Sequence, residues 1–385
     1  MLSSTGWGAT TGGAALIATG YAFGYAEAVA LGAACVVAVV MAAGWTLPRP
    51  KLGAERRIAP RKVGRGDPAE GVVALTNTGR RTRRGLRVTD RCGDQQVTVD
   101  VPPLRAGAAH DLRYALPTTR RGLVPVGPLR VERTDPLGLA RRIRSYGASD
   151  ILVVRPRICL LPVLPSGQAH HVEGPTSDTA DDGSLTFHAL REYVLGDDLR
   201  RVHWRSTART GTLMVRQMVD VSLPHTTLVL DTRGQAYASE DDFELAVDCA
   251  ASIAYAAARS NFPVHLVSEA GPVLHTEGSG NDGEALLDRL ALVRRSEVKS
   301  AAAAFDGLEH HRGGGALVVV TGTGDTDGLS ALGRVRRRFE RVTMLRIGAA
   351  TAAAPDITGS GTDVPQLHIA SLDALLAGWR WEAVR

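Results

Sequence analysis

The sequence predicts an α/β chain in three parts: an N-terminal helical hairpin, a β-sandwich, and a C-terminal doubly wound α/β domain. Three patterns indicate this. Residues 7–47 carry a single charged side chain, residues 71–131 alternate in short runs, and residues 226–379 switch between apolar strand runs and amphipathic helical runs. Because each pattern has the period of a different element, we expect segments at 1–48, 49–160, 161–185 and 186–385.

The first segment is long enough for two transmembrane helices, since one span needs roughly 20 apolar residues. A turn at Gly24–Glu27 would place Trp7 and Trp45 at the same membrane interface. Basic residues follow this segment directly and are missing before it and in the turn, so the positive-inside rule places both ends in the cytoplasm. We expect a multi-pass protein of the inner (cytoplasmic) membrane with soluble domains facing the cytoplasm. A signal peptide cleaved near Ala26–Ala28 and a single span remain alternatives.

The charge and the cysteines narrow the function. A net charge of +5 comes from 45 basic and 40 acidic residues, with no basic block interleaved with aromatics, so we expect no nucleic-acid partner. The cysteines are far apart and form no C-x-x-C pair, which indicates no zinc site and fits a reduced compartment. They are Cys35, Cys92, Cys159 and Cys249.

The middle segment, 49–160, predicts an immunoglobulin-like β-sandwich. Short alternating runs occur at 71–76, 86–89, 97–101, 112–116 and 129–131, with turn residues between them. Alternation with period two buries one face of each strand and leaves its arginines on the other. We interpret this segment as a spacer or docking module. Residues 161–185, rich in Gly, Ser and Asp, read as a linker.

The C-terminal segment predicts a parallel sheet covered by helices on both faces. Apolar strand runs lie at 226–231, 264–267, 316–320, 342–347 and 367–370. Helical runs lie between them at 241–259, 283–295, 328–340 and 371–379. Continuous apolar strands between amphipathic helices are typical of a doubly wound sheet, in which ligands bind at the carboxyl ends of the strands.

The segment Leu190–Arg216 is the most unusual stretch of the chain, because it gathers guanidinium, carboxylate, imidazole and indole groups. Such a cluster is too costly to bury unpaired, so it forms either a paired internal network or a charged binding surface. We single out Arg191, Tyr193, Gly196, Asp197, Asp198, His203, Trp204, Arg209 and Arg216.

These residues resemble the hallmark of the DUF58 proteins, which are bacterial, often membrane-anchored, and similar to von Willebrand factor A (vWA) domains. The usual hallmark reads roughly R-x-Y-x-P-G-D-D-x-R-x-I-[DH]-W-x-x-[ST]-A-R. Here Leu195 replaces the proline and Val202-His203-Trp204 fills the I-[DH]-W positions. The resemblance implies a vWA-like fold and a partner, a MoxR-type AAA+ ATPase thought to act as a chaperone. It also places such proteins beside transglutaminase-like membrane proteins.

A vWA domain holds a metal at its strand ends with a D-x-S-x-S motif plus a distant Thr and Asp. In this chain the first strand ends at Asp231, and Arg233 and Gln235 stand where the serines would be. The second strand ends at Thr321, with Gly322 where an aspartate would follow. Because an arginine repels a divalent cation and Mg²⁺ needs oxygen ligands, we predict no metal, and an arginine partner for Asp231 instead.

We therefore expect a membrane-anchored, non-enzymatic adaptor without a cofactor, which presents a vWA-like surface to the ATPase. Two other functions remain open. One is a hydrolase of envelope precursors, in which His203 and Asp197 act as an acid–base pair. The other is a metal-dependent adhesion module. For the hallmark itself, an internal network with Trp204 buried competes with an exposed interaction surface.

Overall fold

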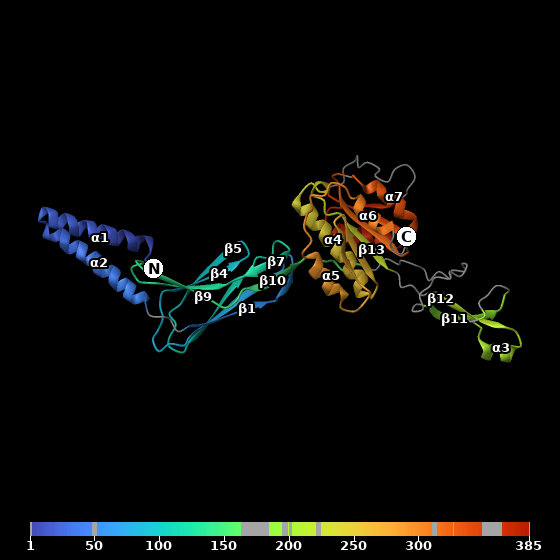
Figure 1. The fold of residues 1–385 in the computed structure, drawn as a ribbon, viewed down its shortest axis with the longest axis horizontal. Helices are drawn as coiled ribbons and strands as arrows, with labels where there is room; N and C mark the ends of the chain where they lie inside the picture. The colour runs from blue at the N-terminus through green and yellow to red at the C-terminus, as the bar shows by residue number, and fades with distance from the viewer. Residues whose placement is uncertain are drawn as a thin grey trace. The chain divides into compact units, whose positions relative to one another are not determined.

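The computed structural model describes residues 2–47, 52–162, 185–194, 199, 202–220, 225–309, 314–325, 327–348 and 364–384. Within these, only the backbone is described for 185–189, 216–220 and 381–384. The chain divides into two compact units, Met1–Pro156 and Arg157–Arg385, and each is described by itself (Figure 1). The predicted linker, 161–185, falls almost wholly outside the described residues.

The first unit begins with two antiparallel helices, α1 (Ser4–Phe23) and α2 (Ala26–Thr46), which pack along their length (Figure 1). Glycines allow this packing: a Cβ added at Gly32 would lie 2.6 Å from the Gly13 carbonyl oxygen. Among the described residues, α2 is the helix that is long and apolar enough to cross a membrane. Helix α1 does not reach that apolar character, since it carries Thr10, Thr11 and several glycines.

Two β-sheets complete the first unit. The smaller has the order β1-β3-β6, made by β1 (Leu52–Ala59), β3 (Glu70–Asn77) and β6 (Ala109–Ala115). The larger has the order β2-β10-β7-β4-β8-β9, made by β2 (Lys62–Gly64), β10 (Asp150–Arg155), β7 (Gly122–Val126), β4 (Leu86–Cys92), β8 (Leu129–Thr134) and β9 (Arg141–Tyr146). Strand β5 (Gln95–Val101) pairs with β4.

Both sheets bury side chains in one shared core. Val73 and Leu75 from β3 meet Val88 from β4 and Val131 from β8, and each is at most 3% exposed. All the alternating runs identified in the sequence lie in strands, because each has apolar residues at every second position facing this core. The immunoglobulin-like topology itself stays a prediction.

The second unit contains a two-stranded sheet, β11 (Leu185–Glu192) with β12 (Met214–Asp220), and a short helix α3 (Trp204–Thr210) between them. An antiparallel bridge between Val202 and Val215, both buried, ties the start of α3 to β12. This β11–α3–β12 element holds the hallmark of the sequence. We call it the hallmark hairpin.

A six-stranded sheet of order β15-β14-β13-β16-β17-β18 forms the rest of the unit. Its strands are β13 (Thr226–Leu230), β14 (Val264–Ser268), β15 (Gly271–His275), β16 (Ala316–Gly322), β17 (Arg341–Ile347) and β18 (Gln366–Ile369). All pairs are parallel except β14 with β15, so the expectation of a wholly parallel sheet is wrong at this edge. The sequence GPVLH gave no strand signal, since glycine and proline are poor strand formers.

Helices cover both faces of this sheet. On one face lie α4 (Glu240–Arg259), α5 (Asp282–Leu290) and α8 (Leu372–Val384), around the core that includes Leu228 and Val320. On the other face lie α6 (Ala302–Glu309) and α7 (Leu332–Val335), around Val229 and Val319. Helix α4 begins with a capping box between Ser239 and Asp242, which explains the acidic first turn seen in the sequence.

Two predicted helices are shorter than expected. The helix predicted at 283–295 ends at Leu290, and the one predicted at 328–340 is a short α7 flanked by 3₁₀ turns, η3 (Leu329–Ala331) and η4 (Arg336–Arg338). Gly328 has a φ of +80°, which no regular helix contains.

Candidate functional site

The carboxyl edge of the sheet carries a row of three polar side chains on neighbouring strands. Asp231 follows β13, Thr321 lies near the end of β16, and Arg346 lies near the end of β17, directly opposite Thr321 in the strand register. Each lies two positions after a core residue that faces α6 and α7 (Val229, Val319 and Met344), so all three share that face of the sheet. Each is at most 2% exposed.

Asp231 is bound by the arginine two residues further along the chain. The Arg233 Nε and Nη2 atoms donate to the two carboxylate oxygens of Asp231 at 3.0 and 2.9 Å. The backbone N–H of Arg233 and the Thr321 hydroxyl add bonds of 3.1 and 2.7 Å. These four donors match the roughly four acceptor positions of a carboxylate, so the carboxylate is fully satisfied.

The Arg233 guanidinium is itself held in place on its other side. Nη1 donates to the carbonyl oxygens of Lys299 and Asp327, each at 2.9 Å, and Nη2 donates to the carbonyl of Asp325 at 3.1 Å. Burial alone would lower the pKa of Arg233, but the hydrogen bonds and charge of Asp231 raise it. A fully buried arginine with this geometry works as a permanent internal counter-ion.

Gln235 and Gly322, the two remaining positions that we compared with the vWA metal motif, also supply no suitable metal ligand. Gln235 turns its side-chain amide to the Lys299 carbonyl at 2.6 Å. Gly322 has no room for a side chain, since a Cβ there would lie 1.9 Å from the Ala236 carbonyl oxygen. An aspartate after Thr321 is therefore sterically excluded. Among the described residues no group of three His, Cys, Asp or Glu side chains is placed to hold a metal.

We predicted that Asp231 pairs with an arginine, with a hallmark arginine as the candidate. The structure assigns the role to Arg233, which the sequence marked only as a foreign residue in a metal motif. An i,i+2 pair of this kind depends on the loop after β13 turning back on itself. Here the turn η2 (Gly234–Ala236) and the bond from the Tyr237 hydroxyl to the Asp231 carbonyl at 2.5 Å hold that loop.

Arg346 is the residue that sequence reasoning missed. Its side chain is fully buried, and none of its three guanidinium nitrogens has a hydrogen-bond partner among the residues that the structure describes. Burial lowers its pKa, and the charge of Asp231 only partly offsets this. A lone arginine inside the apolar run Val342–Ile347 was the available signal, because buried strands rarely carry an unpaired charge.

The hallmark hairpin has a different character, because its large side chains face solvent. Trp204 is 67% exposed and Val194 and Leu199 are similarly exposed, while Arg205 and Arg209 are exposed cations on α3. The hypothesis of a buried tryptophan in an internal network is therefore wrong for Trp204. The indole lies at the start of α3, where it contributes little to any core.

His203 acts as the N-cap of α3. Its Nδ1 atom accepts a hydrogen bond from the backbone N–H of Ser206 at 3.2 Å and lies 2.8 Å from the Ser206 hydroxyl. The imidazole therefore satisfies a free N–H at the helix start, which is the usual work of a capping side chain. Among the described residues, the hydrogen bonds of the imidazole stay within one helical turn.

The remaining hallmark positions are only partly described. Tyr193 lies half-buried and its backbone N–H donates to the Leu213 carbonyl, while the half-buried Arg191 donates from Nη1 to the Glu192 carbonyl. Arg216 lies in β12 opposite Leu190, with its side chain outside the described residues. Three predicted positions lie outside the described residues altogether: Gly196, Asp197 and Asp198.

The fold and the site define an α/β protein with an exposed aromatic and cationic hairpin and an arginine-filled strand edge. A family model described as "Protein of unknown function DUF58" matches residues 189–349, which supports the resemblance over the hallmark hairpin and most of the six-stranded sheet. Comparison with curated proteins gives no match.

The solved structures that match this chain have low TM-scores. The CARDB domain of a Pyrococcus furiosus protein is 18% identical, with a TM-score of 0.21, covering 28% of this chain and 96% of that chain. Cwp6 from Clostridium difficile is 10% identical, with a TM-score of 0.18, covering 77% of this chain and 37% of that chain. Likenesses at these scores carry no argument about function.

Proposed function

We propose that this chain is a membrane-anchored, non-enzymatic adaptor whose vWA-like C-terminal unit binds another protein. The observation that carries the proposal is the exposure of Trp204 beside the cations of α3. Tryptophan and arginine are the residue types most enriched at the energetic centres of protein interfaces. A large indole left in solvent on the same short helix as Arg209 gains more from meeting a partner than from its place in the free chain.

The strand edge supports a binding role over a catalytic one. The Asp231 carboxylate is fully bonded by Arg233 and Thr321, so it offers no free lone pair to a substrate or a proton. The cap formed by His203 engages Nδ1 of its imidazole, so an acid–base role would have to use Nε2. The hydrolase hypothesis has no further support in the described residues.

The anchor is helix α2, which is long and apolar enough to span a membrane. In our proposal α1 accompanies it as a second span, so that the chain is multi-pass and both the β-sheets of the first unit and the whole second unit lie in the cytoplasm. Close packing of α1 on α2 through Gly13 and Gly32 supports this pairing, since small residues drive helix association in lipid.

The proposed partner is a MoxR-type AAA+ ATPase, with a transglutaminase-like membrane protein as a neighbour. This choice comes from the DUF58 resemblance, which the family model supports over residues 189–349. The exposed hallmark hairpin is the surface that we assign to this contact.

Crosslinking of the full-length chain in its native membrane, followed by mass spectrometry, tests the proposal. We expect an AAA+ ATPase among the crosslinked proteins, and a loss of about thirtyfold in its apparent affinity when Trp204 is changed to Ser, as for an interface hot spot. Arg209→Gln should weaken the same contact. Leu292→Ser, which likewise replaces an exposed apolar side chain with serine, is the matched control and should leave the affinity for the ATPase unchanged.

Three results would contradict the proposal. The ATPase could be missing from the crosslinked proteins, or it could be retained in full by Trp204→Ser. Alternatively, Trp204→Ser could lower the thermal stability of the chain as much as it lowers binding, which would make the hallmark hairpin a structural element.

A further inference from the structure

Helix α3 of the hallmark hairpin has two faces of opposite character. On the inner face, the Met214 backbone N–H donates to the Thr207 hydroxyl at 3.0 Å, and the His203 backbone N–H donates to the Met214 carbonyl at 2.8 Å. The two residues after His203 and the two after Thr207 are exposed instead, because residues four apart share one helix face. These exposed residues, which we call the outer stripe, are Trp204, Arg205, Ala208 and Arg209.

The outer stripe reverses the usual arrangement of a helix on a protein surface. A helix normally buries its apolar side chains and exposes its polar ones. In α3 the half-buried positions are His203, Ser206 and Thr207, whereas the indole of Trp204 is 67% exposed. The helix therefore gains little from burying its own side chains, and its largest apolar group is left for another molecule.

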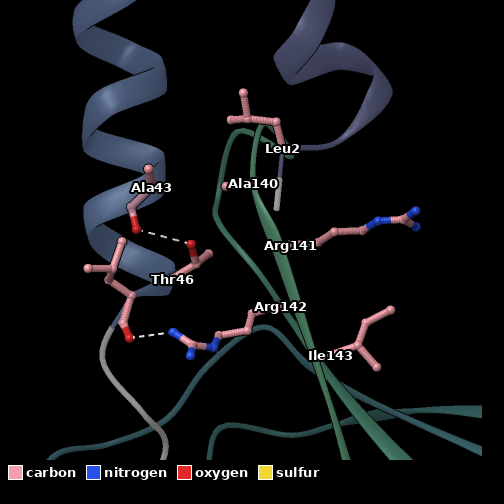
Figure 2. A pocket seen from close by; sticks show the side chains of 8 residues that line it. Leu2, Ala43, Thr46, Ala140, Arg141, Arg142 and Ile143 are labelled. Carbon is pink, nitrogen blue, oxygen red and sulfur yellow. Dashed lines mark hydrogen bonds between the residues drawn. The ribbon is translucent and has the colours of Figure 1, made fainter.

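The two cations of the outer stripe are not used by the fold. The Arg205 and Arg209 side chains make no hydrogen bond or ion pair within the part of the chain that the structure describes, and α3 itself carries no acidic residue. Arg142 shows the contrast, because its Nη1 atom donates to the Leu47 carbonyl at 2.6 Å where α2 meets β9 (Figure 2). The guanidinium groups of α3 can therefore pair with carboxylates of a partner.

The spacing of the outer stripe defines the surface that it fits. Arg205 and Arg209 lie four residues apart on one side of α3, which is about 6 Å along the helix axis. Two carboxylates one turn apart on a second helix have the same spacing. Trp204 directly precedes Arg205, so the matching surface needs an apolar hollow beside the first carboxylate.

We propose that the outer stripe docks on an acidic helix of a partner protein, with Trp204 in an apolar hollow and Arg205 and Arg209 paired with two carboxylates one turn apart. The inference rests on the proposed function and deepens it, because it names the chemistry that the hallmark hairpin recognises. A lipid surface fits less well. Helices that lie in the membrane interface carry several large apolar side chains on one face, and α3 carries one.

A photo-reactive amino acid at position 208 of the full-length chain, activated in the native membrane, tests the chemistry of the partner surface directly. Ala208 is exposed in the middle of the outer stripe, so a probe there samples what the stripe contacts. We expect mass spectrometry to find it joined to a peptide of the ATPase that carries two acidic residues three or four positions apart.

Binding of the full-length chain to the purified ATPase tests the two cations. Arg205→Gln with Arg209→Gln should lower the affinity about tenfold at low salt, from the loss of two partly exposed ion pairs, and by less at high salt. The matched control, Arg294→Gln with Arg337→Gln, removes the same charge from two exposed arginines elsewhere in the second unit and should bind as wild type.

A charge exchange keeps the test informative if a variant folds poorly. Arg205→Glu with Arg209→Glu should bind more weakly than the glutamine variant, because like charges then face each other. Lysines in place of the two acidic residues of the crosslinked ATPase peptide should restore that binding, which an unfolded variant could not show. Failure of this exchange, with the variant folded by circular dichroism, would overturn the pairing.

Other outcomes separate the inference from the proposed function. A crosslink from position 208 to phospholipid or to a peptide without acidic residues would overturn the acidic docking site, as would wild-type binding by the glutamine variant or an equal loss in its control. In those cases an ATPase contact that still depends on Trp204 leaves the proposed function standing. A crosslink to an acidic helix of a different protein would overturn the named partner and support the docking chemistry.

Discussion

Replacing Arg233 with methionine should strongly destabilise the C-terminal α/β sheet. The change removes the two side-chain donors that bind Asp231 and leaves a carboxylate that is 2% exposed with the Thr321 hydroxyl and one backbone N–H. Removing one partner of a buried ion pair costs about 3–5 kcal/mol, because the other charge stays buried without compensation. The carbonyl groups of Lys299, Asp325 and Asp327 each lose one donor as well.

Hydrogen exchange of the full-length chain measures this cost where it arises. Peptides covering β13 and β16 report the free energy of opening of the two strands joined by the Asp231–Thr321 bond. The companion change Asp231→Asn together with Arg233→Met removes both charges, and we expect it to cost less than the sum of the single changes, with a coupling of about 0.5–3 kcal/mol. Gln235→Ala, which loses one exposed bond to the Lys299 carbonyl, should cost about 0.5–1.5 kcal/mol.

A small effect would refute the reasoning. If Arg233→Met cost no more than Gln235→Ala, the guanidinium would not be neutralising a buried carboxylate. Strict additivity of the Asp231 and Arg233 changes would lead to the same conclusion, since two groups that interact directly cannot be independent.

Three further predictions concern single residues. Gly322→Asp should destabilise the sheet by about 1–3 kcal/mol in urea unfolding without creating a magnesium site, because the Ala236 carbonyl occupies the space of the new Cβ. Calorimetry that detects Mg²⁺ binding with unchanged stability would disprove this. Arg346→Met should leave stability unchanged or raise it by about 1–4 kcal/mol, since it replaces a buried charge that has no partner in the described part of the chain with an apolar side chain. A clear loss in the same urea experiment would show that Arg346 has a stabilising partner. Burial, with a smaller contribution from Asp90, raises the pKa of Cys92 from 9.0 to about 11. The folded chain therefore retains the thiol proton to higher pH than the unfolded chain, and the stability of the first unit should fall as pH rises from 9.0 toward 11. Cys92→Ala should flatten that dependence of stability on pH, and an unchanged slope would refute the assignment.

Much of the fold could be predicted from local patterns. The strands β13, β16 and β17 are continuous apolar runs, and their burial on both faces follows from helices on both sides of the sheet. The first turn of α4 was recognisable from its acids. Strand β15 was missed because its edge pairing with β14 compensates for a glycine and a proline, and such tertiary support leaves no trace in a short sequence window.

The candidate site was less accessible from the sequence. The positions of Asp231 and Thr321 at the strand ends followed from the strand pattern, and the unsuitability of Arg233 as a metal ligand followed from its charge. The pairing of Arg233 with Asp231, however, depends on a loop that turns back within two residues, and the exclusion of a side chain at Gly322 depends on the carbonyl of Ala236. Contacts of this kind are set by three-dimensional approach, which spacing along the chain does not encode.

The internal arginine at the strand edge also has a consequence for regulation. A surface built on a bound cation changes with the supply of that cation, so chelators and shifts in magnesium or calcium level can release whatever is attached. Here the balancing charge is covalently part of the chain and is always present. The charge balance at Asp231 should therefore stay the same when EDTA is added.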